Sequence, residues 1–292
     1  MALAQRGAAF GSSVASDLPL PLGRGGGKSL CEPLWVRRGR ADRLLSGDRR
    51  LRRLGGPSGV VGMVSPRRRT VWIERAGPHP GAMWGAVMGI SLPHLLSAAG
   101  SMVLRASCAA KDDRAVAFLG PRRAGKSSIT AALLTEGWRV MADDALLVRA
   151  SGGSIQAQPS FPAMRLWAPL AVSLASTLGL ERAPIHPAAD KEWVFLNEQQ
   201  WSDRAEVQLA CLCVLDDGRL AQLRGTDPMR AILAATYDPE PRSPDRRRRW
   251  FQSASQLASS LPVLRMSVPA DYRPDFRFGG GITRQLQAAK VL

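Results

Sequence analysis

The sequence has few of the residues that mark disulfide-linked or metal-binding proteins. Its 292 residues include only 4 cysteines and 3 histidines. Four cysteines in a chain of this length do not make a disulfide framework. Cys211 and Cys213 lie in an apolar run with no histidine nearby, which indicates core packing, and the three histidines lack the spacing of metal ligands. No basic segment followed by a long apolar run opens the chain, so no signal peptide is expected. We predict a cytoplasmic protein.

One stretch lacks charge altogether. Residues 76–104 contain no charged side chain over 29 positions, which is long enough to cross a bilayer. Two interpretations are open, a membrane span or a buried helix that leads into a strand. Pro78, Pro80 and Pro93 and five glycines interrupt the apolar run. They favour the buried helix, and no membrane association is expected.

Acidic residues are scarce, above all near the N-terminus. The chain has 40 basic and 24 acidic residues, a net charge of +16, and residues 1–70 hold 14 basic and 4 acidic residues, a net charge of +10. The excess therefore lies mostly in one tail. This distribution is not that of a basic nucleic-acid-binding fold, and no stable nucleic-acid binding is expected.

Residues 1–62 show little helical or alternating apolar pattern. They are rich in glycine and arginine, as in 23–27 and 37–53, and such a segment buries too little apolar area to offset the entropy of ordering it. It is either a flexible basic arm that touches a polyanion or an inert leader with Met63 as the start. We expect a disordered leader, since the excess of arginine over lysine is typical of GC-rich coding sequences, where spurious upstream extension is common.

Residues 63–292 have the pattern of one folded α/β domain, with no internal repeat or linker. The expected helices are 90–99, 127–136, 166–178, 228–236 and 246–260. The expected strands are 102–108, 115–119, 139–142, 145–149, 155–158, 193–196, 207–215 and 262–268. The basic residues at the start of helix 246–260 suggest either a solvated face or a contact with RNA or an acidic peptide, and we expect the former.

One motif is sharp. Residues 120–127 read GPRRAGKS and satisfy G-x-x-x-x-G-K-[ST] between an expected strand and an expected helix. In this context backbone N–H groups and the helix N-terminus bind phosphate. Lys126 would reach the β- and γ-phosphates of a nucleotide, and the hydroxyl of Ser127 would bind Mg²⁺. The expected nucleotide-binding residues are Gly120, Pro121, Arg122, Arg123, Ala124, Gly125, Lys126, Ser127 and Ser128.

A pair of acids follows this loop. Only 16 residues separate Lys126 from Asp143, which is followed directly by Asp144. One helix and one strand fill that interval, so both acids should lie at the carboxyl end of the next strand, where α/β sheets bind ligands. Neighbouring residues of a strand point to opposite faces, so the two acids should differ in role. One would bind Mg²⁺, and the other would accept a proton from an attacking hydroxyl.

These motifs resemble the HPr serine kinase/phosphorylase family, and most of all its shorter members from peptide-modification clusters. The resemblance covers about residues 85–200 well and 200–292 loosely. Its segments are 102–108 (MVLRASC), 117–120 (AFLG), 137–144 (GWRVMADD), 161–167 (FPAMRLW) and 191–196 (KEWVFL).

The resemblance implies a P-loop kinase domain built like phosphoenolpyruvate carboxykinase, with a mixed sheet and flanking helices. It implies ATP and Mg²⁺ as cofactors and a serine of a protein or peptide as the acceptor. By position, Lys126 is catalytic, Ser127 and Asp143 hold the metal, and Asp144 is the base, although the order of the two acidic roles stays open. A homo-oligomer also stays open.

Three departures from the family pattern are present. Arg123 stands where members often have glycine, and Arg122 where they have a small residue. Arg105 stands where relatives carry histidine, and an arginine is no proton acceptor. The glycine-rich loop that serves phosphorolysis is missing after the acids, which weakens phosphorylase activity and HPr as the substrate. A ribosomal peptide precursor becomes a comparable acceptor.

Three functions compete at this stage. The first is an ATP-dependent serine kinase centred on Lys126, Ser127, Asp143 and Asp144. The second is a degenerate nucleotide-binding regulatory module, which Arg105 and Arg123 favour. The third is a nucleic-acid-dependent ATPase, which is disfavoured because no further ATPase motif stands out in the sequence. Arg165 and Lys191 are weaker candidates for substrate or nucleotide contacts, and Trp167 and Trp193 are expected in the core or the cleft wall.

Overall fold

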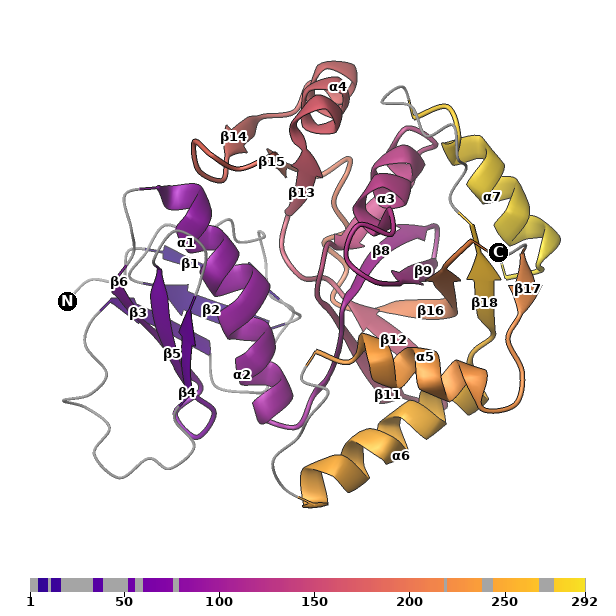
Figure 1. Cartoon of the computed structure of the whole chain (residues 1–292), viewed down its shortest axis with the longest axis horizontal. Helices are drawn as coiled ribbons and strands as arrows, with labels where there is room; N and C mark the ends of the chain where they lie inside the picture. Colours follow the sequence, from indigo (N-terminus) through magenta and orange to yellow (C-terminus); the bar gives the residue numbers. More distant parts are fainter. Residues whose placement is uncertain are drawn as a thin grey trace.

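The computed structural model is a mixed α/β structure built from three sheets and flanking helices (Figure 1). This agrees with the mixed sheet and flanking helices expected from the sequence. The structure describes residues 5–9, 12–16, 34–38, 52–55, 60–75, 79–217, 220–237, 244–267 and 276–291.

The largest sheet among the described residues has nine strands in the order β10-β8-β9-β16-β12-β11-β7, with β18 beside β16 and β17 beside β18. Strand β16 runs parallel to β9 and β18, and the other pairs are antiparallel. The strands are β7 (Met102–Leu104), β8 (Ala106–Lys111), β9 (Arg114–Leu119), β10 (Arg139–Ala142), β11 (Leu146–Ser151), β12 (Ser154–Gln158), β16 (Val207–Leu215), β17 (Ala221–Gln222) and β18 (Val263–Met266).

Helices cover both faces of this sheet because its central strands are apolar on both sides. Phe118 of β9 packs in one buried cluster with Ile129 of α3 (Lys126–Leu134) and Ile282 of α7 (Gly279–Ala288). Ala117 of β9 faces the other way, toward α5 (Asp227–Ala235) and α6 (Pro244–Ser260). The alternation along β9 therefore places α3 and α7 on one face of the sheet and α5 and α6 on the other.

A smaller sheet lies beside α3. It consists of β13 (Ala163–Trp167), β15 (Lys191–Phe195) and β14 (Arg182–Pro184), in that order, and α4 (Ala168–Leu178) packs on it. The expected helix 166–178 and strand 193–196 lie within two residues of α4 and β15, whereas β13 and β14 were not expected. This sheet carries Arg165 on β13 and Lys191 on β15.

The uncharged stretch forms one helical segment that starts ten residues before the expected helix. Helix α1 (Pro80–Ala86) continues through the π-helical turn η2 (Val87–Ser91) into α2 (Leu92–Ala98), and β7 follows. This confirms a buried helix that leads into a strand. Among the described residues, no helix has the length and apolarity needed to cross a membrane.

The described parts of residues 1–62 form strands, which differs from the expected disordered leader. The third sheet has the order β1-β2-β3-β6-β5-β4, and the expected domain boundary at 62/63 falls inside β5. The strands are β1 (Gln5–Ala9), β2 (Ser12–Ser16), β3 (Leu34–Arg38), β4 (Arg52–Gly55), β5 (Val61–Ser65) and β6 (Thr70–Arg75). The physical reason is cross-strand burial, because Val36 of β3 is fully buried against β6 and the helical segment.

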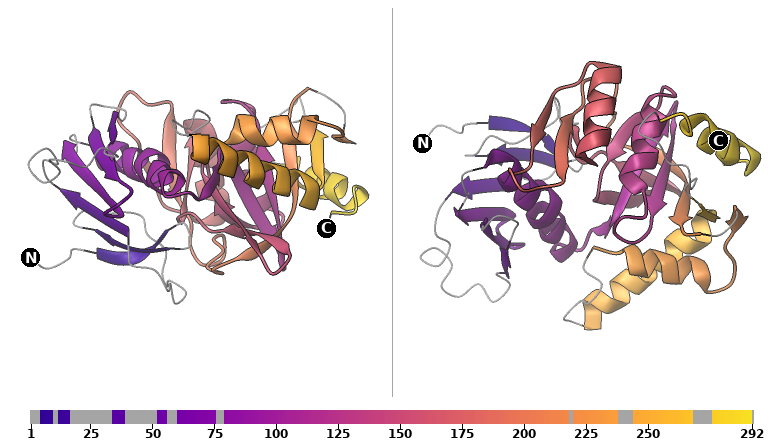
Figure 2. Two further views of the ribbon diagram at one scale, coloured as in Figure 1. Left: turned by 90° about the horizontal axis from the view of Figure 1, so that it is seen from below. Right: turned by 45° about the horizontal axis from the view of Figure 1, so that its top comes forward.

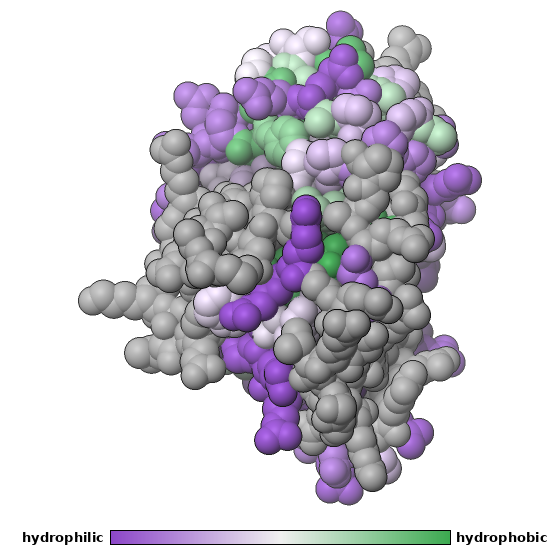
Figure 3. Space-filling model, turned by 90° about the vertical axis from the view of Figure 1, so that its left-hand side faces the viewer, coloured by the Kyte–Doolittle hydropathy of each residue, from purple (hydrophilic) through white to green (hydrophobic). Residues whose placement is uncertain are grey.

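The helical segment α1–α2 lies between this N-terminal sheet and the rest of the molecule in both views of Figure 2. The exposed side of the N-terminal sheet is largely hydrophilic where described residues reach the surface (Figure 3). Arg37, Arg38, Arg67 and Arg68 are exposed there. These four arginines therefore lie at the surface, whereas Val36, Val64 and Val71 are buried.

Candidate functional site

The loop between β9 and α3 has the strand–loop–helix context that the motif predicted. A Cβ atom at Gly120 would lie 3.1 Å from the Cβ of Ala124 and 3.3 Å from the carbonyl oxygen of Leu215, so the strand end leaves no room for a side chain. Gly125 has a φ of 88° and caps α3 in the left-handed conformation that glycine favours. Both glycines of the motif are thus required by the backbone.

The backbone of this loop offers donors. In the described structure, the N–H groups of Arg122, Arg123 and Gly125 have no acceptor, whereas that of Ala124 donates to the carbonyl of Pro121 at 3.3 Å. The unpaired N–H groups of Arg122, Arg123 and Gly125 lie next to the first turn of α3. The N–H groups of that turn have no partner within the helix and carry partial positive charge. Such an arrangement binds anions.

Lys126 is folded onto this loop. Its Nζ donates to the carbonyl oxygens of Gly120 and Pro121, both at 2.8 Å. Burial lowers the pKa of this ammonium, while the negative charges of Asp144 and Asp143 act in the opposite direction. Lys126 is therefore a partly desolvated cation between the loop and the acid pair.

Asp143 lies just past the end of β10 and joins three elements. Its carboxylate is 4% exposed, and it accepts hydrogen bonds from Ser127 Oγ at 2.7 Å and from the backbone N–H of Arg165 at 2.8 Å. Burial raises its pKa against the effect of both hydrogen bonds and of the Arg165 charge. A hydroxyl and a carboxylate oxygen held side by side are ligand types that Mg²⁺ prefers, so these residues fit the expected metal.

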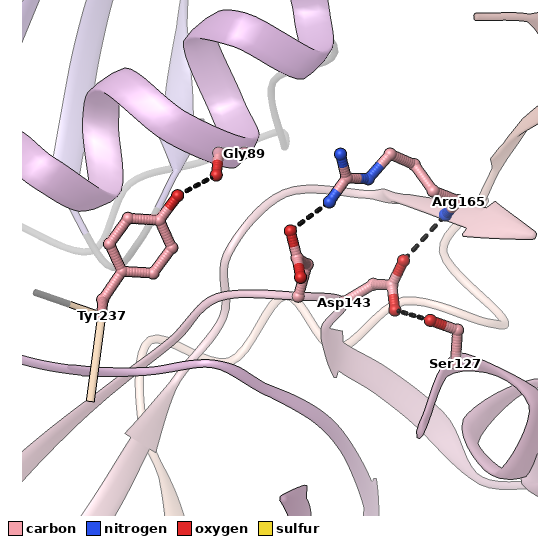
Figure 4. A network of polar contacts seen from close by, with 6 residues as sticks. Gly89, Ser127, Asp143, Arg165 and Tyr237 are labelled. Atoms are coloured by element: carbon pink, nitrogen blue, oxygen red, sulfur yellow. Dashed lines mark hydrogen bonds and ion pairs between the residues drawn. The ribbon is translucent and has the colours of Figure 1, made fainter. Parts of the chain in front are cut away.

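Asp144 differs from its neighbour. It has a φ of 76°, its side chain is 36% exposed, and it forms an ion pair with Nη2 of Arg165. Burial acts to raise its pKa, but the positive charges of Arg165, Arg105 and Lys126 outweigh burial and hold the pKa below its usual value. Figure 4 shows Asp143 between the hydroxyl of Ser127 and the backbone N–H of Arg165.

Two tryptophans hold the cations around the acids. The guanidinium of Arg165 lies 5.6 Å from the ring centre of Trp193, and Arg123 and Lys191 lie 5.7 and 5.8 Å from that of Trp167. Burial lowers the pKa of Lys191. The sequence named these side chains as candidates, and the structure brings Arg165 and Lys191 to the site and places Trp193 in the core and Trp167 half-buried.

Tyr237 also lies at this site, and no motif in the sequence points to it. Its hydroxyl donates to the carbonyl oxygen of Gly89 in η2, and Arg105 lies 4.3 Å from its ring centre. Burial, together with the charge of Asp144, raises its pKa, so the phenol stays protonated. Tyr237 is one of only two tyrosines in the chain, which was the one available signal.

The other named residues lie as follows. Pro121, Arg122 and Arg123 are exposed in the loop, and Ser128 is buried in the first turn of α3. Cys211 and Cys213 are buried in β16 as expected, with their sulfur atoms 3.8 Å apart. Among the described residues, no group of three or more His, Cys, Asp or Glu side chains gathers into a metal site.

Comparisons with known proteins find likenesses among solved structures only. No protein-family model matches the chain, and no curated protein matches it. Among solved structures, the chain is similar to the Hpr(Ser) kinase/phosphatase from Coxiella burnetii, with a TM-score of 0.32 and 9% identity, over 65% of this chain and 96% of that one.

Proposed function

We propose that this protein transfers the γ-phosphoryl group of ATP to a serine hydroxyl of a protein or peptide. The observation that carries the proposal is the connection of three parts in one site. The hydroxyl of Ser127, at the end of the loop, donates to Asp143, and the adjacent Asp144 is held by Arg165. A phosphate-binding loop, a metal-type oxygen pair and an ionised carboxylate are the parts that phosphoryl transfer to an alcohol requires.

The nucleotide would bind on the loop. The unpaired N–H groups of Arg122, Arg123 and Gly125 would hold phosphate oxygens, and Lys126 would exchange its loop carbonyls for the β- and γ-phosphates. Ser127 and Asp143 would hold Mg²⁺, which supplies neutralisation of phosphate charge when it is bound. The raised pKa of Asp143 is consistent with a carboxylate that gains a cation on binding.

Asp144 would act on the acceptor. The serine oxygen forms a bond to the γ-phosphorus, the bond from that phosphorus to the β–γ bridging oxygen breaks, and ADP leaves. The proton of the serine hydroxyl passes to the carboxylate of Asp144. A pKa held below its usual value by Arg165 keeps this carboxylate ionised and ready at neutral pH. These features support Asp143 as the metal-side acid and Asp144 as the base.

The second candidate is a nucleotide-binding module without transfer activity. It is favoured by the position of Lys126, whose ammonium contacts its own loop, and by Arg123, which has a φ of 69° and lies over Trp167. Both contacts would have to be replaced when a nucleotide binds. Nucleotide binding is common to the two candidates, so only the loss of transfer distinguishes them.

The test is a transfer assay with γ-labelled ATP and Mg²⁺. The full chain is mixed with a lysate of host proteins and with a library of serine-containing peptides, and the variants are Lys126→Ala and Asp144→Asn. Asp203→Asn is the control, because Asp203 is an exposed carboxylate outside the site. We expect Asp144→Asn to bind nucleotide and to lose transfer by about 10²–10⁴-fold.

Transfer at the wild-type rate by Asp144→Asn would overturn its role as the base. Absence of labelled product with the wild type, together with a nucleotide-dependent thermal shift, would overturn the kinase and support the binding module. A labelled acceptor that disappears with Lys126→Ala and persists with Asp203→Asn would support the kinase.

A further inference from the structure

Arg105 is a cation whose charge acts on the expected base, Asp144, and which has no carboxylate hydrogen-bonded to it among the described residues. It lies in the short break between β7 and β8, it is exposed, and its guanidinium stacks 4.3 Å from the ring centre of Tyr237. Within the part of the chain that the structure describes, this guanidinium has no carboxylate partner and donates no hydrogen bond. An exposed arginine without a partner usually samples many rotamers, whereas this one is stacked on an aromatic ring.

The ring under Arg105 is itself fixed. The Tyr237 hydroxyl donates to the carbonyl of Gly89, and the backbone of Gly89 lies against the guanidinium of Arg165, since a Cβ there would be 3.3 Å from Nη1. Arg165 in turn pairs with Asp144. Tyr237 and the helical turn therefore tie the position of Arg105 to that of the acid pair. Figure 4 shows the hydrogen bond from Tyr237 to Gly89 and the hydrogen bond from Arg165 to Asp143.

Three other cations of the site already make specific contacts. Lys126 contacts the loop, Arg165 neutralises Asp144, and Lys191 lies over Trp167. The positive side chains that act on the acids or on one another are Arg105, Arg122, Lys126, Arg165 and Lys191. They exceed the two carboxylates in number. With a nucleotide on the loop, Arg105 would remain a positive charge near Asp144 that no described carboxylate pairs with.

We infer that Arg105 is a specificity-determining residue that binds a carboxylate of the acceptor next to the serine that is phosphorylated. This rests on the proposed function and names its substrate class, an acidic peptide segment. A guanidinium binds a carboxylate through charge-assisted, often bidentate hydrogen bonds, and the ring of Tyr237 leaves its N–H edges available. The same contact would reject an acceptor with a basic residue at that position.

The experiment compares serine peptides that differ only in the residues beside the serine. One peptide carries aspartate, one carries asparagine and one carries lysine, all with amidated C-termini. A fourth is neutral with a free C-terminal carboxylate directly after the serine, which distinguishes a side-chain carboxylate from a terminal one. They are assayed with the full-length wild type, with Arg105→Glu and with Arg114→Glu, which makes the same charge change at the far end of β9 from the loop.

We expect the wild type to prefer a peptide that carries a carboxylate, in a side chain or at the C-terminus, over the amidated asparagine peptide. The expected preference is about tenfold in kcat/KM. Arg105→Glu should lose that preference and favour the lysine peptide, with KM for ATP unchanged, and Arg114→Glu should behave as the wild type. A wild type with no preference would overturn the inference, as would an Arg105→Glu variant that retains it. An effect confined to KM for ATP would assign Arg105 to the nucleotide instead.

A binding measurement keeps this test independent of turnover. Fluorescein-labelled aspartate and asparagine peptides are titrated in the presence of Mg²⁺ and a non-hydrolysable ATP analogue. Tighter binding of the aspartate peptide that Arg105→Glu abolishes supports the inference even if no peptide is phosphorylated. Selective binding of the aspartate peptide without any phosphorylation would contradict the proposed phosphoryl transfer and leave the inference on Arg105 supported. Equal binding of both peptides by the wild type would overturn the acidic acceptor.

Discussion

At the scale of single residues, two adjacent carboxylates have opposite environments. Asp143 is buried and its pKa is raised, whereas Asp144 is more exposed and three cations hold its pKa down. Asp144 has a φ of 76°, so the chain leaves the extended conformation of β10 between the two acids. Titratable neighbours whose pKa values are pushed apart can take separate roles in acid–base chemistry. Under the proposed function, consecutive positions would thus supply the acid that binds the metal and the acid that acts as the base.

We predict that Asp143→Asn stabilises the protein in the absence of nucleotide. Burial raises the pKa of Asp143 above its unfolded value, so the ionised carboxylate costs stability at neutral pH, and this cost fades as the pH falls and the group protonates. Asparagine removes the charge, its Oδ1 can accept from the backbone N–H of Arg165, and its Nδ2 can donate to Ser127 Oγ in place of the present reverse bond. Urea unfolding at pH 7 should show a gain on the order of 1 kcal/mol over the wild type.

The gain should shrink as the pH is lowered, and Asp203→Asn should show none. A loss of stability at pH 7 would mean that the carboxylate is stabilised by its surroundings and that burial does not dominate. The same variant should lose Mg²⁺-dependent nucleotide binding, which titration calorimetry checks.

A second prediction concerns Arg165. Its charge opposes the effect of burial on Asp144, so Arg165→Gln should raise the pKa of Asp144. Since the base works in its ionised form, the acidic limb of the pH–rate profile for kcat should move to higher pH. Glutamine retains the backbone N–H that donates to Asp143. Arg182→Gln breaks an ion pair with Glu192 on the same small sheet and should leave the profile in place. An unshifted limb in Arg165→Gln would contradict the pairing.

The local part of this site could be predicted from the sequence, whereas Tyr237 could not. Gly120, Gly125, Ser127 and the acids follow a motif whose spacing sets one strand, one loop and one helix. The contact of Tyr237 with Gly89 joins positions 148 residues apart, and no periodicity reports such a pair. Likewise, the sequence shows Arg105 only as a departure from the family pattern, and the structure places it on the ring of Tyr237.

At the scale of elements, the helical segment α1–α2 is shaped by glycines at a regular spacing. Gly81, Gly85 and Gly89 recur every four residues and so share one side of the helix. A Cβ at Gly81 would lie 2.5 Å from the carbonyl oxygen of Pro184, and Gly81 also accepts a hydrogen bond from Trp193 Nε1 at 2.9 Å. This side therefore lets the helix approach the small sheet closely.

We predict that Gly81→Ala and Gly85→Ala have opposite effects on stability. The added methyl group at Gly81 meets backbone atoms of Pro184 and Ile185, which cannot rotate away, so it should cost about 1–3 kcal/mol. At Gly85 it meets only the Trp193 ring at 3.9 Å, so alanine should stabilise the helix by about 0.5–1 kcal/mol. Chemical denaturation of both variants measures this. Equal effects would mean that the close contact is absent.

Element positions were predicted well where the apolar pattern was long and local. The strands β9, β10 and β16 and the helix α3 were placed within about two residues. The helix start at Pro80 was missed because prolines and glycines hid its periodicity, although proline is favoured in the first turn. The strands β1–β4 were missed because each is only 4–5 residues long and gains its burial from neighbours that are distant in the sequence.

At the scale of the whole molecule, one buried cluster joins the N-terminal sheet to the site. Val36 and Val71 from that sheet pack in it with Met88 from the helical segment, and Trp193 and Tyr237 reach it from the site. Trp84 of α1 adds edge-on contacts to Trp193 and Phe195, with ring centres 6.4 and 5.4 Å apart. The aromatic side chains that support Arg165 and Arg105 are thus part of a core that the N-terminal sheet covers.

This arrangement predicts that residues 1–62 contribute to stability, in contrast to the inert leader expected from composition. Removal of residues 1–62 would take away β3 and expose the edge of β6, where Trp35 pairs with Thr70 and Arg37 with Trp72. The burial of Val36 alone is worth about 1.5–3 kcal/mol. An unpaired, apolar strand edge also favours aggregation. We expect residues 63–292 to unfold at a lower temperature than the full chain and to bind a hydrophobic dye.

The full-length variant Val36→Ala separates this effect from loss of the basic tail, because it keeps every charge. It should lower the thermal midpoint, whereas Arg38→Ala, at an exposed position of the same strand, should not. Equal midpoints for residues 63–292, Val36→Ala and the full chain would show that the sheet does not depend on β3. Because Trp193 and Tyr237 share the buried cluster with Val36, a destabilised Val36→Ala should also loosen the site. Its transfer activity should then fall at a lower temperature than that of Arg38→Ala.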